Sequence, residues 1–472
     1  MIENLKPYPE IKDSGLSWLG EIPAHWDIKR NGSLFQQRNA VGEPDWPILE
    51  VSLRTGVRIR EFGSSKRKQA MSDKAKYKCA AKGDYVYNMM RMWQGAAGIA
   101  PVDGLVSPAY VVAKPLPHVN PGYFASLFRI DDYLAEIDAF SRGIVKDRNR
   151  LYWDQFKQIP TPCPPPEEQD AIVRFLTWAT NSLDRAIRAK RRIIDLLNEQ
   201  KQAIIHRAVI RGLDPFVPLK DSGIPWLGVI PVHWEVRKLK KVTPKVGVGL
   251  VINPSSHYVD HHVSGAVPML LGNNIVPMGL RLERLRYISR MANEELPASR
   301  LSAGDIVVVR VGAPGVAAVV PPHLDGCNCA SVMIVRGHIS YAADWLALCF
   351  NSSVASRQID IVKYGAAQKQ FNIGHAVDFL FPVPPLKEQL QIVDCVATEA
   401  LPISKTASRV ESEITLLREY RTRLIADVVT GKLDVRQAAA GLPEEIKPLD
   451  PGEPGNEIEE LDPDEEEAPE LP

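Results

Sequence analysis

Two stretches of the chain repeat apolar residues in alternating steps of four and three. This spacing is typical of the seam of a coiled coil and predicts two long helices. Each stretch follows a proline cluster, at 160–166 and at 382–385, and a few charged residues such as Lys190 and Arg421 interrupt the stripe. The apolar seam positions are Ile172, Leu176, Leu183, Ile187, Ile194, Leu197 and Ile204 in the first helix, and Ile392, Val396, Ile403, Val410, Ile414, Leu417 and Leu424 in the second.

The two helices should each hold about 40 residues and span roughly 60 Å at about 1.5 Å per residue. Prolines and Glu in the first turn suit the start of a helix. Pro402 should kink or break the second helix. The helices could each pack separately on a globular core, but we favour antiparallel pairing, because the apolar stripes would otherwise stay exposed to water.

An internal repeat organises the chain. KDSGLSWLGEIPAHWDIK begins at Lys12, and KDSGIPWLGVIPVHWEVR begins 208 residues later at Lys220. The blocks PPPEEQ and PPLKEQ precede the two predicted helices, with their Glu-Gln pairs 220 residues apart. The repeated tryptophans are expected to be packing anchors, and the histidines beside them to be structural.

Between these landmarks lie two segments, roughly 27–158 and 235–380, that share a skeleton. KGDYVYNMM at Lys82 parallels AGDIVVVRV at Ala303. Runs rich in β-branched residues at 106–112, 306–311 and 332–335 predict strands, and the aligned stretches 121–143 and 340–365 each predict a helix. The sequence therefore predicts an α+β fold with two mixed α/β domains and two long helices. The expected divisions are 1–158 (including a repeat segment at 6–30), 159–214, 215–380, 381–436 and 437–472.

The composition fits a folded protein of about three folding units, because 45% of its 472 residues are hydrophobic. No apolar stretch reaches the length of a membrane helix, and the N-terminus lacks a signal pattern. Six irregularly spaced cysteines suit a reducing compartment better than a disulfide framework. We therefore expect a cytoplasmic protein without a membrane partner.

The net charge of zero hides an uneven distribution. Residues 441–472 hold 13 Asp and Glu against one Lys, so the remaining 56 Lys and Arg against 44 Asp and Glu give residues 1–440 a charge of +12. A basic body makes a polyanion partner plausible, although an ordinary solvated basic surface explains the charge equally well. The acidic segment is expected to be disordered, either as a solubilising extension or as a mimic of nucleic acid.

The order of domain, helix, domain, helix resembles the specificity subunit of type I restriction–modification systems. The resemblance rests on PPPEEQ, PPLKEQ, a TGKLD ending at Asp434 and the duplicated Trp-Leu-Gly, Ile-Pro and His-Trp pattern, and it covers residues 6–435. It implies two target recognition domains that each read half of a split site in double-stranded DNA. It also implies antiparallel spacer helices, approximate two-fold symmetry and no catalytic activity in this chain.

The same resemblance implies the partners. Two copies of a modification subunit would methylate adenine at N6, and restriction subunits would complete the enzyme. These partners would use S-adenosylmethionine, ATP and Mg²⁺, whereas this chain would bind no cofactor.

Phosphate contacts need Lys and Arg, and base readout needs Arg, Asn or Gln directed into a groove. Each single candidate could equally be an ordinary surface charge or a turn asparagine. In the first domain the candidates are Arg54, Arg58, Arg60, Lys66, Arg67, Lys68 and Arg91, with Lys146, Arg148 and Arg150 beside them. In the second domain they are Asn273, Asn274, Arg310, Lys363, Tyr364, Lys369 and Gln370.

Motifs for catalysis are incomplete. The sequence has no full D/N-P-P-Y/F motif for adenine methylation and no G-x-x-x-x-G-K-S/T loop for ATP. His257, His261 and His262, or His323 with Asp325, Cys327 and Cys329, have spacings that could bind a metal. Surface histidines and half-buried cysteines are the simpler interpretation, so no metal site is predicted.

Two other functions remain open from the sequence. A coiled-coil scaffold that assembles proteins without reading DNA would explain the helices, but not the basic body or the two divergent domains. The chain could also be the recognition half of a fused restriction–methylation protein. Genes for a methyltransferase and an ATP-dependent nuclease beside this one would favour the specificity subunit.

Overall fold

A computed structural model describes residues 5–42, 45–53, 55–60, 76–143, 149–243, 245–251, 257–337, 341–362, 370–443 and 446. The chain divides into two compact units. Unit 1 comprises residues 1–191 and 411–472, and unit 2 comprises residues 192–410. Most of the acidic C-terminal segment lies outside the described residues, so its disorder stays a prediction.

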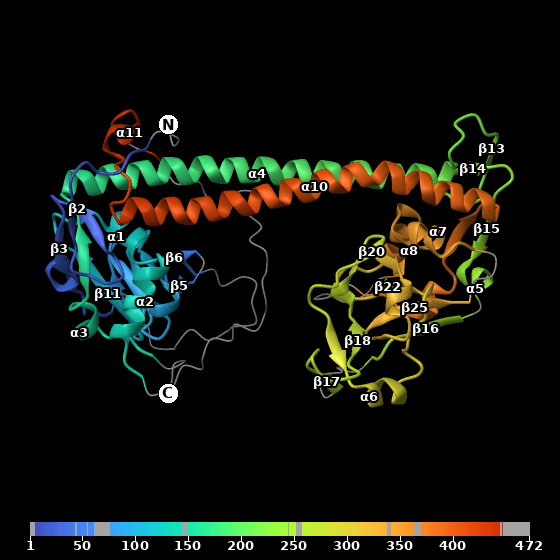
Figure 1. Cartoon of the computed structure of the whole chain (residues 1–472), viewed down its shortest axis with the longest axis horizontal. Helices are drawn as coiled ribbons and strands as arrows, with labels where there is room; N and C mark the ends of the chain where they lie inside the picture. Colours follow the sequence, from blue (N-terminus) through green and yellow to red (C-terminus); the bar gives the residue numbers. More distant parts are fainter. Residues whose placement is uncertain are drawn as a thin grey trace. The chain divides into compact units, whose positions relative to one another are not determined.

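Two long helices, α4 (Pro166–Arg211) and α10 (Leu386–Val429), each contribute to both units. In unit 1, Lys190 Nζ lies 2.6 Å from Glu413 Oε2, and Arg421 Nη1 lies 2.8 Å from Asp184 Oδ1. Because the position on α4 falls as the position on α10 rises, the helices pair antiparallel (Figure 1). The prediction of two long, antiparallel helices is confirmed, and charged residues that interrupt the seam find polar partners across it.

The predicted seam faces the protein interior along both helices. Nine of its positions are buried, namely Ile172, Leu176, Leu183, Ile187, Ile392, Val396, Val410, Ile414 and Leu424. The other five, Ile194, Leu197, Ile204, Ile403 and Leu417, are half-buried. The helix α10 runs through Pro402 without ending, so the proline does not break it, and the alternative of a kink stays a prediction. Pro402 lies on the exposed side, where water can solvate the carbonyl whose backbone donor proline removes.

The centre of unit 1 is a four-stranded sheet in the order β4 (Phe35–Gln37), β11 (Tyr110–Pro115), β8 (Tyr85–Asn88) and β9 (Ala97–Ile99). Both of its faces are buried, with Tyr85 and Tyr87 in one apolar cluster and Val86 in another. The strand predicted at 106–112 is wrong. Strand β10 (Gly104–Val106) ends there, and a turn closed by the bond from Tyr110 N to Ser107 O leads into β11.

Unit 2 contains a sheet of the same order, built from β16 (Lys245–Val248), β25 (Val332–Arg336), β22 (Ile306–Val309) and β23 (Ala317–Val319). Its strands β22 and β25 confirm those predicted at 306–311 and 332–335, except that β22 ends at Val309. Unit 2 also has a second four-stranded sheet, in the order β17 (Tyr258–Val259), β21 (Arg286–Ile288), β18 (Val267–Leu270) and β24 (Asn328–Cys329).

Each stretch predicted as one helix forms two. Unit 1 has α1 (Pro121–Leu127) and α2 (Asp131–Phe140), and unit 2 has α7 (Ala343–Phe350) and α8 (Ser353–Val362). In unit 2 the second helix begins where the Ser352 hydroxyl accepts a hydrogen bond from Val354 N at 3.1 Å. Such a side chain satisfies a free backbone donor at a helix start and favours a new helix over continuation.

Short paired strands hold each repeat block beside the start of a long helix. The hairpin β1 (Ile11–Asp13) and β2 (Glu21–Pro23) matches β13 (Leu219–Asp221) and β14 (Val229–Pro231). The pair β3 (Asp27–Arg30) and β12 (Pro160–Cys163) matches β15 (Glu235–Lys238) and β26 (Leu380–Val383). The α+β fold class and its internal duplication are therefore confirmed.

The remaining strands and helices are also short. Unit 1 holds β5 (Leu49–Ser52), β6 (Gly56–Ile59), β7 (Lys78–Ala80), α3 (Trp153–Phe156) and α11 (Arg436–Ala440). Unit 2 holds β19 (Ile275–Val276), β20 (Gly279–Leu280), α5 (Leu239–Val242), α6 (Arg290–Glu295) and α9 (Ile373–Ala376). Among the described residues, no helix combines the length and the apolar character needed to cross a membrane.

Candidate functional site

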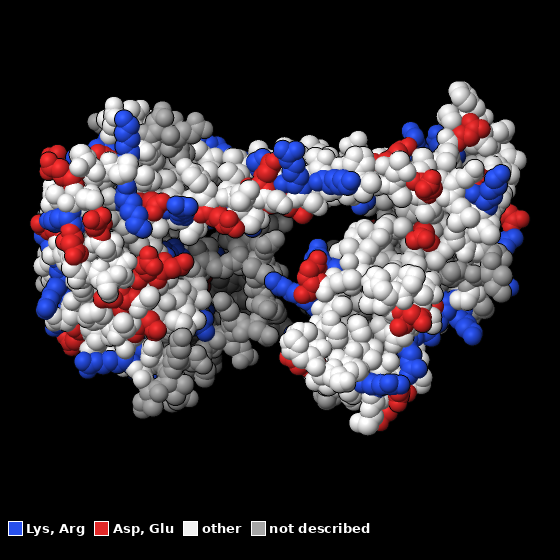
Figure 2. Space-filling model, viewed as in Figure 1, with Lys and Arg blue, Asp and Glu red and all other residues white. Residues whose placement is uncertain are grey.

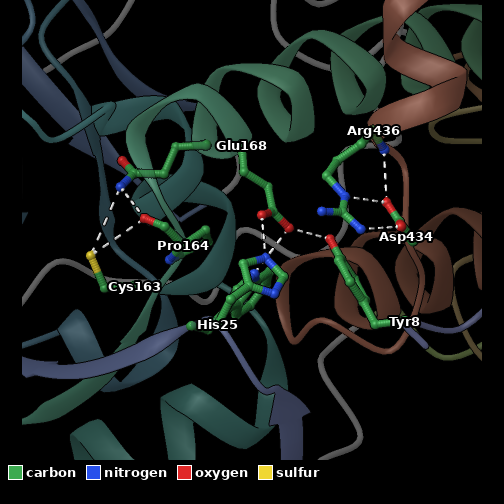
Figure 3. Close-up of polar contacts among 9 residues, drawn as sticks. Tyr8, His25, Cys163, Pro164, Glu168, Asp434 and Arg436 are labelled. Atoms are coloured by element: carbon green, nitrogen blue, oxygen red, sulfur yellow. Dashed lines mark hydrogen bonds and ion pairs between the residues drawn. The ribbon is translucent and has the colours of Figure 1, made fainter. Parts of the chain in front are cut away.

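The duplicated sequence blocks meet at a joint around Glu168 in unit 1 (Figure 3). Glu168 lies in the first turn of α4, is only 5% exposed, and accepts a hydrogen bond from Trp26 Nε1 at 2.9 Å. The Tyr8 hydroxyl donates to the same oxygen, Oε1, while the other oxygen, Oε2, lies 2.7 Å from His25 Nε2. The carboxylate thus ties three parts of the repeat block to the start of the helix, where negative charge is favoured.

Unit 2 repeats the joint around Glu388, in the first turn of α10. Glu388 Oε2 lies 2.7 Å from His233 Nε2, and Glu388 Oε1 accepts a bond from Trp234 Nε1 at 3.1 Å. Both tryptophans are fully buried, as a packing anchor requires. The contacts explain why the His-Trp pair and the Glu recur together in the sequence.

The glutamine that follows each Glu fixes the helix start to the rest of its unit. Gln169 donates to Pro164 O and accepts from Asn120 N, both within 2.9 Å. Gln389 donates to Pro384 O and accepts from Ala342 N, within 3.0 Å. The Glu-Gln pair is therefore a structural device, since its side chains are occupied in holding backbone and ring donors.

Only unit 1 extends its joint with the segment after α10. The backbone of Asp434 pairs with that of Lys6, and the Arg436 guanidinium lies 5.1 Å above the Tyr8 ring. Burial alone would raise the pKa of Asp434, but hydrogen bonds from Arg436 lower it overall. Burial and the bond to Glu168 raise the pKa of Tyr8, so its hydroxyl stays protonated as a donor.

A second duplicated feature lies where β8 in unit 1 and β22 in unit 2, the third strands in the order of the two main sheets, come to an end. We call this region of each unit its strand-end edge. In unit 2, Phe371 N bonds to Arg310 O, and Val311 pairs with Gln370, so residues about 60 apart in sequence meet there. Asn273 belongs to a short 3-10 helix, Gly272–Asn274, which follows β18. A Cβ at Gly272 would lie 3.7 Å from Val309, at the end of β22. The structure therefore gathers the candidates Asn273, Arg310 and Gln370 at this edge.

The strand-end edge of unit 1 is built alike. Leu151 N bonds to Met89 O just after β8, and the backbone of Arg150 pairs with the backbone of Arg142. Arg91 follows two residues after Met89, at the start of a 3-10 helix. Arg142 is exposed and Arg150 half-exposed. Arg142 was not predicted, because only its pairing across the loop places it beside Arg150.

Other predicted contacts lie elsewhere or have a structural role. Arg58 is exposed in β6 and pairs with Glu50, while Arg60 follows the same strand. Asn274 is buried, and its amide bonds to Leu271 N and Arg281 O, which leaves it no freedom to reach a base. The remaining candidates, Arg54, Lys66, Arg67, Lys68, Lys146, Arg148, Lys363, Tyr364 and Lys369, lie outside the described residues.

The distribution of surface charges and the possible metal ligands were compared with the predicted sites. On the face shown in Figure 2, Lys and Arg are interspersed with Asp and Glu over both units. Among the described residues, one group could hold a cation, formed by the exposed Asp260, His261 and His262. In the other set of possible ligands, Cys327 and Cys329 are buried, and burial raises the pKa of Cys327 to about 12.

Comparisons with known proteins agree with this architecture. No protein-family model matches the chain. A segment of 87 residues is 34% identical to the specificity subunit of the type I restriction enzyme MjaVIII from Methanocaldococcus jannaschii, covering 18% of this chain and 19% of that one. The chain thus matches about a fifth of the length of this curated relative. The resemblance to type I specificity subunits found in the sequence is confirmed for this segment.

Two solved structures align with most of the chain, and one of them shows a similar fold. A chain from a study of complex assembly and conformational transition in a type I restriction–modification system aligns over 87% of this chain and 99% of its own length. The TM-score is 0.60 and the identity 15%. The HsdS subunit of Thermoanaerobacter tengcongensis aligns over 86% and 96%, with a TM-score of 0.42 and 15% identity. The first of these shows a shared fold.

Proposed function

We propose that this chain is the non-catalytic specificity subunit of a type I restriction–modification enzyme. Each unit would read one half of a split site in double-stranded DNA through its strand-end edge. The observation that carries the proposal is the duplication itself, in which both units present the same sheet, joint and edge while their exposed side chains differ. Two readers with different side chains suit a site with two different halves.

The chemistry of the edges supports DNA as the ligand. Asn and Gln amides pair with adenine, and Arg pairs with guanine, when these groups reach the major groove. Unit 2 supplies Asn273, Arg310 and Gln370, whereas unit 1 supplies Arg91, Arg142 and Arg150. The excess of basic residues outside the acidic segment supplies the electrostatic part of binding, which does not depend on the base sequence.

The proposed partners follow from the duplication. Two duplicated units on one chain offer approximately equivalent surfaces to two copies of one partner. We propose that these are adenine-N6 methyltransferase subunits and that restriction subunits join them in the cytoplasm. S-adenosylmethionine, ATP and Mg²⁺ would be bound by those partners.

Methylome sequencing tests the proposal directly. A host that carries the whole operon is compared with one that lacks only this gene. We expect one split motif with methylated adenines to vanish with the gene. If the motif persists, or if no split motif exists while the methyltransferase is expressed, the chain does not direct methylation and a coiled-coil scaffold becomes the better account.

Single substitutions assign each edge to a half-site. Arg91→Ala should relax only one half of the methylated motif, and Arg310→Ala only the other, with a loss of discrimination of roughly 10- to 100-fold at the affected base. Lys405→Ala, an exposed position on α10, is the control and should leave the motif unchanged. Equal effects of both substitutions on both halves would contradict separate readers.

A further inference from the structure

One pair of equivalent residues has opposite surroundings in the two units. Tyr8 and Phe216 occupy the same place in the repeat, four residues before Lys12 and Lys220. Tyr8 is 5% exposed, whereas Phe216 is 89% exposed. An aromatic ring left almost wholly in water is costly, so the difference requires a structural reason.

In unit 1 the reason is a cover made by the segment after α10. Val435, Ala439 and Leu442 are buried in the same apolar cluster as Tyr8 and Trp26. The short helix α11 carries Ala439 and lies beside the N-terminal segment (Figure 1). Arg436, from the same helix, lies over the Tyr8 ring, as a cation over an aromatic face does.

Unit 2 lacks such a cover. After α4 ends at Arg211, the chain runs directly into the hairpin β13–β14, so no segment equivalent to α11 exists among the residues described there. Four apolar residues near Phe216 in the sequence or in the hairpin that follows it are also exposed, namely Leu213, Leu219, Val229 and Val232, at 38% to 49%, and we call these five residues the Phe216 patch. The hairpin register brings Leu219, Val229 and Val232 to neighbouring backbone positions, since Leu219 pairs with Pro231, Asp221 pairs with Val229, and Val232 N bonds to Pro218 O.

Glu388 lies close to the chain just before the patch, since a Cβ at Gly212 would lie 3.2 Å from Glu388 Oε1, and it is less satisfied than its counterpart Glu168. Glu168 is 5% exposed and receives the Tyr8 hydroxyl as a third donor. Glu388 is 26% exposed, and the equivalent of Tyr8 is a phenylalanine that has no hydroxyl to donate. An incoming arginine or lysine would find both an acceptor and an aromatic face here.

We infer that this Phe216 patch is a docking site for another polypeptide, which supplies a short helix with small aliphatic side chains and one basic residue. The partner segment takes the place that α11 takes on Tyr8. The first repeat shows what covers this surface, and the exposed carboxylate fixes the sign of the partner's charge. The inference concerns assembly and holds whether or not the chain reads DNA.

A peptide with the sequence of residues 434–443, DVRQAAAGLP, serves as the probe. The full chain carries 4-fluorophenylalanine at position 216, and its fluorine resonance is followed as the peptide is added. We expect a saturable shift, with binding at least tenfold weaker for a peptide carrying Val435→Ser, Ala439→Glu and Leu442→Ser. Glu388→Gln in the chain should also weaken binding of the original peptide. The absence of a saturable shift, or equal shifts with both peptides, overturns the inference.

The assembled complex provides the second measurement. Phe216→Asp should reduce co-purification of one partner subunit at least tenfold, because it places a charge in the patch without disturbing a buried residue. Ile11→Asp is the matched control, since Ile11 is 53% exposed on the equivalent hairpin of unit 1, and should have no effect. If a chain ending at Pro443 shows an altered resonance at position 216 without any partner, the acidic segment of this chain is the occupant and the inference is wrong.

Discussion

Arg421 Nη1 lies 2.8 Å from Asp184 Oδ1 across the two long helices of unit 1, and this contact has a counterpart in unit 2. Shifting both residues by the repeat offset of 220 gives Lys201 and Ser404, whose side chains lie 3.1 Å apart. The internal repeat of the sequence is therefore also present in individual polar contacts between the two helices. The counterpart is weaker, because serine replaces the carboxylate of Asp184.

This relationship predicts that Ser404→Asp stabilises unit 2. The new carboxylate would pair with Lys201 as Asp184 pairs with Arg421. Both positions are half-exposed, so the gain in the free energy of unfolding should be about 0.2–1 kcal/mol. Denaturant unfolding at low and high salt measures it, and the gain should shrink at high salt. Ser404→Asn has the same shape without the charge, and an equal gain from it would show that pairing is not the cause.

The two joints predict unequal losses when their carboxylates are removed. Glu168→Ala leaves the donors of Tyr8, Trp26 and His25 without their acceptor, two of them on buried residues. Removing one partner of a buried hydrogen bond costs about 1–3 kcal/mol. We therefore expect Glu168→Ala to cost roughly 3 kcal/mol or more, and Glu388→Ala less, because water reaches Glu388.

Hydrogen exchange of β12 and β26 reports the two joints separately, since these strands precede α4 and α10. The faster exchange should be confined to β12 in the first variant and to β26 in the second. Glu167→Ala is a neighbouring control, because Glu167 lies in the same first turn of α4 and is exposed. If Glu167→Ala lowers the free energy of unfolding as much as Glu168→Ala does, the cause is the negative charge at the start of the helix and not the hydrogen bonds of the joint.

The helices and the duplication could be predicted from sequence because they rest on local patterns. Steps of four and three place Ile172 and Leu176 on one helix face wherever the helix packs. Of the two outcomes predicted at Pro402, a kink or a break, the break does not occur, because local propensity cannot show which side of a helix faces water. The single strand predicted at 106–112 failed for a similar reason, since a Ser-Pro turn outweighed the β-branched residues around it.

Only part of the candidate site could be predicted from the sequence. Arg310 and Gln370 could be named one by one as suitable side chains, but their meeting depends on a tertiary contact between residues 60 apart. Arg142 was missed for the same reason. The joint was visible as a repeat, yet nothing in the sequence says that Glu168 and Trp26 bond to each other. Long-range pairing is what sequence patterns do not encode.

The thiols predict a simple chemical result. Burial raises the pKa of Cys327 to about 12 and raises the pKa of Cys349, while Cys79, Cys163 and Cys329 are also buried. Burial keeps the reagent away from these five thiols, whereas Cys395 is half-buried and can be reached although burial and Glu399 raise its pKa as well, so iodoacetamide at pH 8 should modify only Cys395 in the native chain. All six should react in concentrated guanidinium chloride, and mass spectrometry counts them.

The raised pKa of Cys327 also predicts how the free energy of unfolding changes with pH. The pKa of Cys327 is higher in the folded chain than the usual value of about 8.5 for an exposed thiol. Its contribution to folding is therefore fully present below pH 8.5 and is lost as the pH rises toward 12. Cys327→Ala should flatten this part of the curve, and an unchanged curve would contradict the assignment.

Two neighbouring asparagines separate recognition from folding. Asn274 is buried and bonds to the backbone at Leu271 and Arg281, so Asn274→Ala should lower the free energy of unfolding by about 1–3 kcal/mol. Asn273 is exposed at the strand-end edge, so Asn273→Ala should leave stability within about 0.5 kcal/mol. If Asn273 reads a base, the same change should relax one position of one half-site. Thermal unfolding and methylome sequencing of both variants measure the two effects, and a methylation motif that Asn273→Ala leaves intact would remove Asn273 from the proposed reading surface.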